Sequence, residues 1–141
     1  MGDPQRPFTP EWAAAFRDAI EADAGYRQAA AGWTWPVAFV LDAAPEYGYP
    51  DAVAMQLELE RGRCHAAALL APDAVTAPVA LRAPYAVWKS VVRGELDPVV
   101  AVTGGKFRVS AGAMTLMLHP RAATALVACA RAVPTLFPDE A

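Results

Sequence analysis

The sequence contains no uninterrupted apolar run near the roughly 18 residues that a membrane-spanning helix needs. Apolar residues are nevertheless abundant, because 55% of the 141 residues are hydrophobic and only 19% are charged. A chain of this composition buries enough apolar surface to fold, which excludes a disordered protein. We therefore expect a folded, soluble protein without stable membrane insertion.

Clusters of basic residues are also missing, and the formal net charge is -3. Proteins that bind nucleic acids neutralise phosphates with clustered Lys and Arg, so the sequence argues against a nucleic-acid partner. Positive charge does exceed negative charge between Arg82 and Arg131. Two interpretations of this stretch stay open: solvated charge on helices and turns, which we favour, and contact with an anion or a lipid headgroup.

Cysteine is scarce, and the two present, Cys64 and Cys129, lie in apolar segments. Their spacing is not that of a zinc site or a redox motif, so we interpret both as reduced core residues. Residues 1–4 lack the basic start and apolar stretch of a secretory signal. The cytoplasm is therefore the default location.

The length fits one domain with a substantial core. Residues 1–8 are rich in proline and polar groups, and we expect them to form a flexible N-terminal arm. Residues 9–141 are expected to form a single domain.

Helix signals open this domain. Thr9 and Pro10 fit an N-cap followed by the first helical position. From Trp12 onward, apolar residues recur at i, i+3, i+4, i+7 and i+8. Gly25 is expected to break this helix, and a second short helix is expected to stop at Gly32.

Alternation of apolar and polar residues then predicts strands. It is clearest over residues 53–60, and Arg61-Gly62-Arg63 fits a hairpin turn that leads into a returning antiparallel strand. The expected strands cover residues 35–41, 53–60, 64–70, 79–81 and 106–110.

The second half is mainly helical. Asp97-Pro98 repeats the cap signature, and Pro120 is expected to divide the last helical region because its ring disrupts an interior turn. The expected helices cover residues 84–93, 99–102, 113–118 and 121–133. The order of elements implies an α+β fold with helices covering one face of a sheet.

Two segments of this half, residues 84–99 and 104–109, resemble the sterol carrier protein type 2 family, as a bacterial stand-alone member. The resemblance rests on an amphipathic helix, the link Gly94-Glu95-Leu96-Asp97-Pro98, a second helix, and the strand Gly105-Lys106-Phe107-Arg108-Val109. It is specific over residues 84–118 and general over most of the chain. Two departures are Ala111-Gly112 after the fifth strand and the Pro120 break.

The resemblance implies a five-stranded, mostly antiparallel sheet whose covering helices enclose an apolar tunnel for a lipid, fatty acyl group or sterol, with no cofactor. Asp97 and Pro98 would cap a helix, and Lys106 and Phe107 would begin the fifth strand. Tunnel-lining positions fall on Val102, Met114, Met117 and Leu118.

The residues themselves also allow a ligand site, since flexible Met and aromatic side chains suit the wall of an apolar cavity. The alternative is that they fill a dry core. With the resemblance included, the expected ligand-contacting residues are Trp35, Phe39, Met55, Leu57, Trp88, Val92, Val102, Phe107, Met114, Met117 and Leu118.

No arrangement of catalytic residues is visible. Cys64 and His65 are neighbours on a strand and point to opposite faces, and no metal-ligand cluster appears. We expect reversible binding or transfer of a hydrophobic small molecule. One alternative is a biosynthetic enzyme that uses the tunnel as a reaction chamber, for which Asp42, Glu58, His65 and His119 are the first residues to test. Another is an accessory or dimerisation module, and a homodimer stays open. The tyrosines of residues 45–50 either rim the tunnel or cover the sheet edge.

Overall fold

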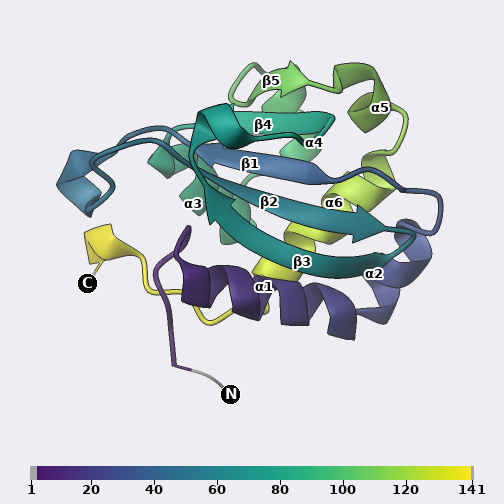
Figure 1. Ribbon diagram of the computed structural model, residues 1–141, viewed down its shortest axis with the longest axis horizontal. Helices are drawn as coiled ribbons and strands as arrows, with labels where there is room; N and C mark the ends of the chain where they lie inside the picture. Colours follow the sequence, from purple (N-terminus) through teal and green to yellow (C-terminus); the bar gives the residue numbers. More distant parts are fainter. Residues whose placement is uncertain (1–2, 141) are drawn as a thin grey trace.

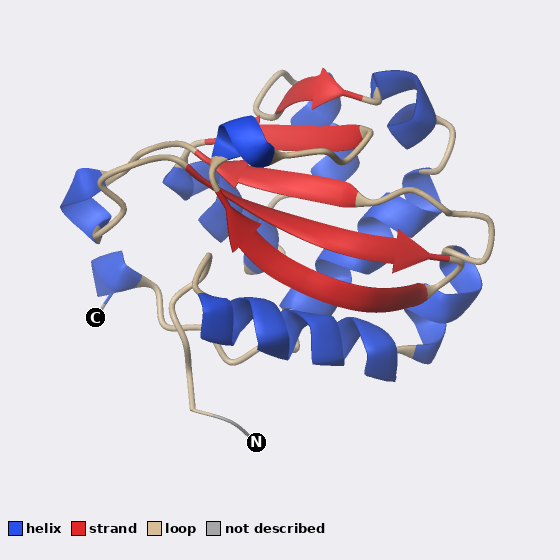
Figure 2. Cartoon of the chain, in the orientation of Figure 1, coloured by secondary structure: helices blue, strands red, loops and turns tan. Residues whose placement is uncertain are grey.

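The computed structural model describes residues 3–140. It contains a five-stranded sheet in the order β3-β2-β1-β4-β5, with most of the helices gathered on one side of it (Figures 1 and 2). The strands are β1 (Val37–Leu41), β2 (Val53–Glu60), β3 (Arg63–Leu70), β4 (Val79–Ala83) and β5 (Arg108–Ala111). The helices are α1 (Pro10–Ala22), α2 (Ala24–Ala29), α3 (Tyr85–Val92), α4 (Pro98–Thr103), α5 (Ala113–Met117) and α6 (Pro120–Ala130).

The predicted α+β class and the five-stranded, mostly antiparallel sheet are confirmed. The pairs β1–β2, β2–β3 and β4–β5 are antiparallel, whereas β1 and β4 are parallel at the centre of the sheet. In Figure 1, α3, α4 and α6 lie behind the sheet, and α1 follows the edge formed by β3. The space between this helical layer and the sheet contains the core.

Three helix starts follow the local signals in the sequence. The Thr9 hydroxyl accepts a hydrogen bond from the Trp12 N–H at 3.3 Å and caps α1. The Asp97 carboxylate accepts from the first N–H groups of α4, at 2.8 Å from Val99. Pro120 begins α6, which confirms the predicted break after α5.

Several predicted boundaries shift by two or three residues, and two of the differences have clear physical causes. Gly25 does not break the first helix but lies inside α2. The break falls at Asp23, which has extended backbone angles and whose carboxylate accepts from the Tyr26 N–H at 2.7 Å, because Asp caps a new helix better than it continues an old one.

The fifth strand begins at Arg108 and not at Lys106. The N–H groups of Lys106 and Phe107 instead donate to the Ala101 carbonyl at 2.8 and 3.1 Å. They therefore complete the C-terminal end of α4 before the strand starts.

Alternate residues of β2 point to the two opposite faces of the sheet. Met55 and Leu57 are buried toward the helices and pair with Phe39 and Val37 of β1. Gln56 lies on the opposite face, where its side-chain oxygen accepts from the N–H groups of Thr76 and Ala77. The helix-facing side of the sheet is therefore continuously apolar.

Of residues 1–8, expected as a flexible arm, residues 1 and 2 lie outside the described residues, and residues 5–8 contact the body of the domain. Phe8 is buried, and the Pro7 carbonyl accepts a hydrogen bond from the Tyr49 hydroxyl. The Gln5 N–H donates to the Pro134 carbonyl at 3.1 Å. The mobility of this segment in solution stays a prediction.

Gly112 joins β5 to α5 in a left-handed conformation, with φ of 76°. A Cβ atom at this position would lie 2.5 Å from the Pro78 carbonyl oxygen. Glycine is therefore required where the chain turns out of the sheet toward α5.

Candidate functional site

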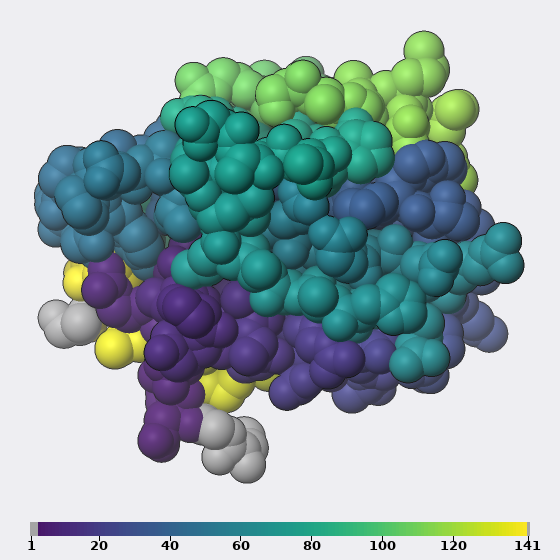
Figure 3. All heavy atoms as spheres, viewed as in Figure 1, coloured from purple at the N-terminus to yellow at the C-terminus, as the bar shows by residue number. Residues whose placement is uncertain are grey.

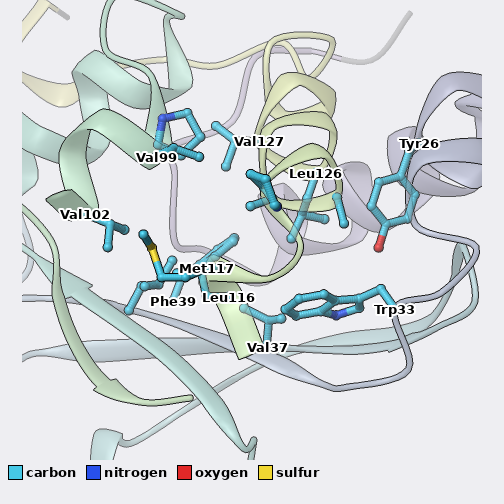
Figure 4. Close-up of a pocket in the computed structure, with 15 residues that line it drawn as sticks. Tyr26, Trp33, Val37, Phe39, Val99, Val102, Leu116, Met117, Leu126 and Val127 are labelled. Carbon is cyan, nitrogen blue, oxygen red and sulfur yellow. The ribbon is translucent and has the colours of Figure 1, made fainter. Parts of the chain in front are cut away.

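A hollow lies between the sheet and the helices α2, α4, α5 and α6. Its cavity volume is about 50 Å³. Figure 4 shows the residues around it. The 15 lining residues are Tyr26, Trp33, Val37, Phe39, Leu81, Pro98, Val99, Val102, Leu116, Met117, Pro120, Ala122, Ala123, Leu126 and Val127.

The lining is apolar apart from two side-chain groups, the Tyr26 hydroxyl and the Trp33 indole N–H. The indole N–H donates to the Trp35 carbonyl at 2.7 Å. The hydroxyl of Tyr26, a residue that is only 1% exposed, has no hydrogen-bond partner within residues 3–140. Burial raises the pKa of Tyr26 well above its ordinary value, and Cys64 and Cys129 raise it further. The hydroxyl therefore stays protonated and able to donate.

The hollow has a closed end and an open side. Tyr26 and Trp33 are buried at the closed end, on the opposite side of the hollow from Val102 in Figure 4. Met117 and Pro120, which also line the hollow, are exposed to solvent. The mouth is therefore on the side formed by α5 and the start of α6.

A second, smaller hollow lies beneath α1 and α3. Its lining is also apolar, and it includes Met55, Trp88 and Val92. Phe39 and Val127 line both hollows. Those two side chains thus stand between the two spaces, and a continuous tunnel would have to pass them.

The predicted ligand-contacting residues divide into four groups. Phe39, Val102 and Met117 line the main hollow, and Met55, Trp88 and Val92 line the second. Leu57 and Phe107 are buried in the core, and Trp35 packs against it, without lining either hollow. Met114 and Leu118 are directed to solvent, with exposed fractions of 73% and 70%.

The short helix α5 explains the last group. Only Leu116 of this helix is buried, and it is the residue that faces the hollow together with Met117. Figure 3 shows that the light-green segment after β5 forms one edge of the molecular surface. A five-residue helix at an edge can direct only part of its apolar side chains inward.

Several lining residues were not predicted as site residues. Tyr26 and Trp33 come from α2 and the segment before β1, and their positions follow only from tertiary packing. Ala123, Leu126 and Val127 of the last helix also line the hollow, and their i, i+3, i+4 spacing was a usable signal in the sequence.

None of the four polar residues proposed for the enzyme alternative lines the hollow. Asp42 accepts from Arg82 at 2.6 Å and from Arg108 at 2.7 Å. Glu58 accepts from Gln56. His65 pairs with Glu60 at 3.3 Å, and His119 packs edge-on against Trp33 with ring centroids 5.4 Å apart.

Four cations of the basic stretch are held by carboxylates of the same chain. Arg82 and Arg108 share Asp42. Lys89 binds Asp139 and Glu140 at the C-terminal end of the described chain, and Arg93 also pairs with Glu140. These ion pairs give the four cations a structural role.

The tyrosines of residues 45–50 do not rim the main hollow. The ring of Tyr47 packs against that of Tyr85 with centroids 4.5 Å apart, and Tyr49 packs 6.3 Å from the same ring. Within the described chain, no three His, Cys, Asp or Glu side chains are placed to hold a metal ion. No helix among residues 3–140 is both long and apolar enough to cross a membrane.

Solved structures resemble this chain closely. A crystal structure of sterol carrier protein 2 is 31% identical, with a TM-score of 0.86, and the alignment covers 91% of this chain and 99% of that one. A solution structure of a conserved hypothetical protein from Thermus thermophilus, described as possibly a sterol carrier protein, is 29% identical, with a TM-score of 0.85 over 96% of this chain and 94% of that one.

A more distant structure, of the UbiJ-SCP2 ubiquinone synthesis protein, is 15% identical, with a TM-score of 0.51 over 92% of this chain and 98% of that one. At this identity it shows a shared fold alone. No protein-family model and no curated protein matches the chain.

Proposed function

The chain belongs to the sterol carrier protein 2 family, and from this premise we propose that it reversibly binds, and thereby carries, a hydrophobic small molecule in the main hollow. The observation that carries the proposal is the lining itself. It consists of apolar side chains from the sheet and the helices, and only one of its polar side-chain groups lacks a partner. Such a surface favours an apolar occupant over a polar one.

Burial of apolar ligand surface alone provides enough free energy for useful affinity, without a covalent bond to the ligand. Burying ten methylenes of an acyl chain is worth about 8 kcal/mol before the cost of association is subtracted. The hollow itself is smaller than the roughly 300–1,000 Å³ of typical small-molecule pockets, because its cavity volume is about 50 Å³.

The hollow must widen to accept such a ligand, because its cavity volume is only about 50 Å³. Met117 lies at the exposed side of the hollow on the short helix α5, and a flexible thioether side chain can change rotamer at small cost. The proposal therefore assigns the entrance to α5 and the start of α6.

The test is native mass spectrometry of the purified protein with a panel of fatty acids, fatty alcohols, methyl ketones and sterols. The expected result is saturable uptake of one molecule per chain for at least one class, confirmed by displacement of a fluorescent fatty acid. Failure of every class to bind at micromolar concentration would contradict the proposal.

A further inference from the structure

The closed end of the main hollow carries one polar group whose hydrogen-bonding capacity is unused. This is the Tyr26 hydroxyl, which belongs to a residue 1% exposed and has no partner within the described chain. Figure 4 shows Tyr26 at one end of the hollow, with its oxygen directed toward the side where Trp33 lies.

The neighbouring polar groups are already committed. The Trp33 indole N–H donates to the Trp35 carbonyl, and the thiols of Cys64 and Cys129 donate to the carbonyls of Ala66 and Ala125. A buried hydroxyl without a partner destabilises a folded protein, and a phenylalanine would fill the same space without that cost. The hydroxyl is therefore explained best by a partner that arrives with the ligand.

The chemistry of the hollow restricts what that partner can be. The hydroxyl stays protonated, because burial raises the pKa of Tyr26, and its proton therefore needs an acceptor. The lining contains no Lys, Arg or His. A carboxylate or phosphate at this depth would lose its hydration without gaining a counter-ion, which is strongly unfavourable. The acceptor is consequently a neutral oxygen.

We infer that the preferred ligand is an apolar molecule whose leading end carries a neutral oxygen acceptor, such as a ketone, ester or alcohol, and that this oxygen binds the Tyr26 hydroxyl. The inference rests on the proposed function, because it names the ligand class of the same hollow. It makes Tyr26 the residue that determines which apolar molecules are retained.

The test compares a methyl ketone with the hydrocarbon of equal length, each in the wild-type protein and in Tyr26→Phe. The chain length is the one at which the ketone binds best. For each protein, the affinity for the ketone is divided by the affinity for the hydrocarbon. The measured quantity is this ratio in the wild type divided by the same ratio in the variant. The two ligands differ in hydration, but this difference is the same for both proteins and cancels. We expect a value of about ten, the effect of one lost hydrogen bond to a buried group.

Tyr85→Phe is the matched control. The Tyr85 hydroxyl donates to Asp139 at 2.7 Å, and Tyr85 does not line the main hollow. This variant should leave the ketone-to-hydrocarbon ratio at its wild-type value. A fatty acid of equal length should not gain from Tyr26, and a gain as large as that of the ketone would overturn the assignment of a neutral acceptor.

A second measurement needs no variant. The carbonyl stretching band of the bound ketone should move to lower frequency than in hexane, because the oxygen accepts a hydrogen bond. An unshifted band, or an affinity ratio that is unchanged in Tyr26→Phe, would overturn the inference while ligand uptake itself continued. If the wild-type protein bound neither the hydrocarbon, nor the ketone, nor any class of the panel, the proposed function itself would be contradicted.

Discussion

The two halves of the helical layer cover the same sheet in different ways. Beneath α1 and α3 the core consists largely of aromatic rings that leave only the smaller hollow, whereas beneath α4, α5 and α6 the main hollow is lined mainly by aliphatic side chains. In the aromatic half, the rings of Phe8, Phe39 and Phe107 surround Trp88 with centroids 5.5, 5.0 and 4.7 Å away.

In the other half, valines and alanines of the helices face the main hollow. Val99 and Val102 extend from α4, and Ala122 and Ala123 from α6, toward the same face of the sheet. The hollow thus results from the size of the side chains and not from a missing element. The aromatic half is packed more closely, and the aliphatic half leaves the main hollow.

The difference in packing between the two halves predicts that Trp88→Ala has the largest effect on stability. Trp88 is buried among three rings, and its indole N–H donates to the Val40 carbonyl at 2.9 Å. We expect the free energy of unfolding to fall by about 3–5 kcal/mol, measured by urea denaturation.

Trp33→Ala is the matched substitution in the aliphatic half. Trp33 is equally buried and also donates to a carbonyl, but it borders the main hollow, whereas Trp88 borders only the smaller one, so Trp33 has fewer contacts to lose. We expect its cost to be smaller than that of Trp88→Ala by at least about 1 kcal/mol. Equal costs for the two variants would show that the two halves do not differ in packing.

The next largest effect is expected on ligand binding, for a substitution that fills the main hollow. Ala123 lines the hollow and is partly buried, so Ala123→Phe places a ring where the ligand would lie. We expect ligand affinity to fall by more than about tenfold, since even one methylene in an apolar pocket changes affinity by such factors. Displacement of a fluorescent fatty acid measures the change.

Ala128→Phe is the control on the same helix, because Ala128 is exposed on the outer face of α6. It should leave the affinity within about twofold of the wild type. If both phenylalanine variants bound the ligand as well as the wild type, the ligand would have to occupy another part of the molecule.

The smallest effect is expected at the edge where α1 meets β3. The Glu21 carboxylate accepts from the Arg63 guanidinium and from the Cys64 N–H, and these bonds lower the pKa of Glu21 to about 2. A depressed pKa contributes stability above the ordinary value near 4.5 and loses it as the pH falls toward 2. Glu21→Gln should therefore lower Tm by a few degrees at pH 7 and by less at pH 3.

Asp73→Asn provides the reference for this pH series, because Asp73 is exposed in the turn Pro72–Ala74. Its Tm should follow that of the wild type at both pH values. A Glu21→Gln difference that stays constant from pH 7 to pH 3 would show that the carboxylate charge does not stabilise this edge.

Local signals in the sequence predicted most of the fold. Thr9, Asp97 and Pro120 act through hydrogen bonds or ring constraints within one turn, so their effect on helix boundaries is independent of the rest of the chain. Gly25 misled the prediction because glycine tolerates a helix, while the neighbouring Asp23 provides a stronger cap.

The site was less predictable, because its walls come from distant segments. Met114 has the right chemistry for a cavity wall, but a short helix at the sheet edge directs it to solvent. Tyr26 carries no sequence signal of its own, since its hydroxyl is isolated only after α2 packs near α6. Residue type predicted the lining chemistry, and tertiary packing selected the residues.

The parallel pairing of β1 with β4 has a consequence for how the chain folds. The β2–β3 hairpin can form locally around Arg61 and Gly62, both of which have positive φ. Val37 and Val79 are partners across the central pair, yet the whole hairpin and its connections lie between them in sequence. Closing so long a loop lowers the conformational entropy of the chain before the contacts that stabilise the pairing can form. Such non-local pairing slows folding. We therefore expect the pairing of β1 with β4 to limit the folding rate, and the sheet that forms one wall of the main hollow to be complete only after this step.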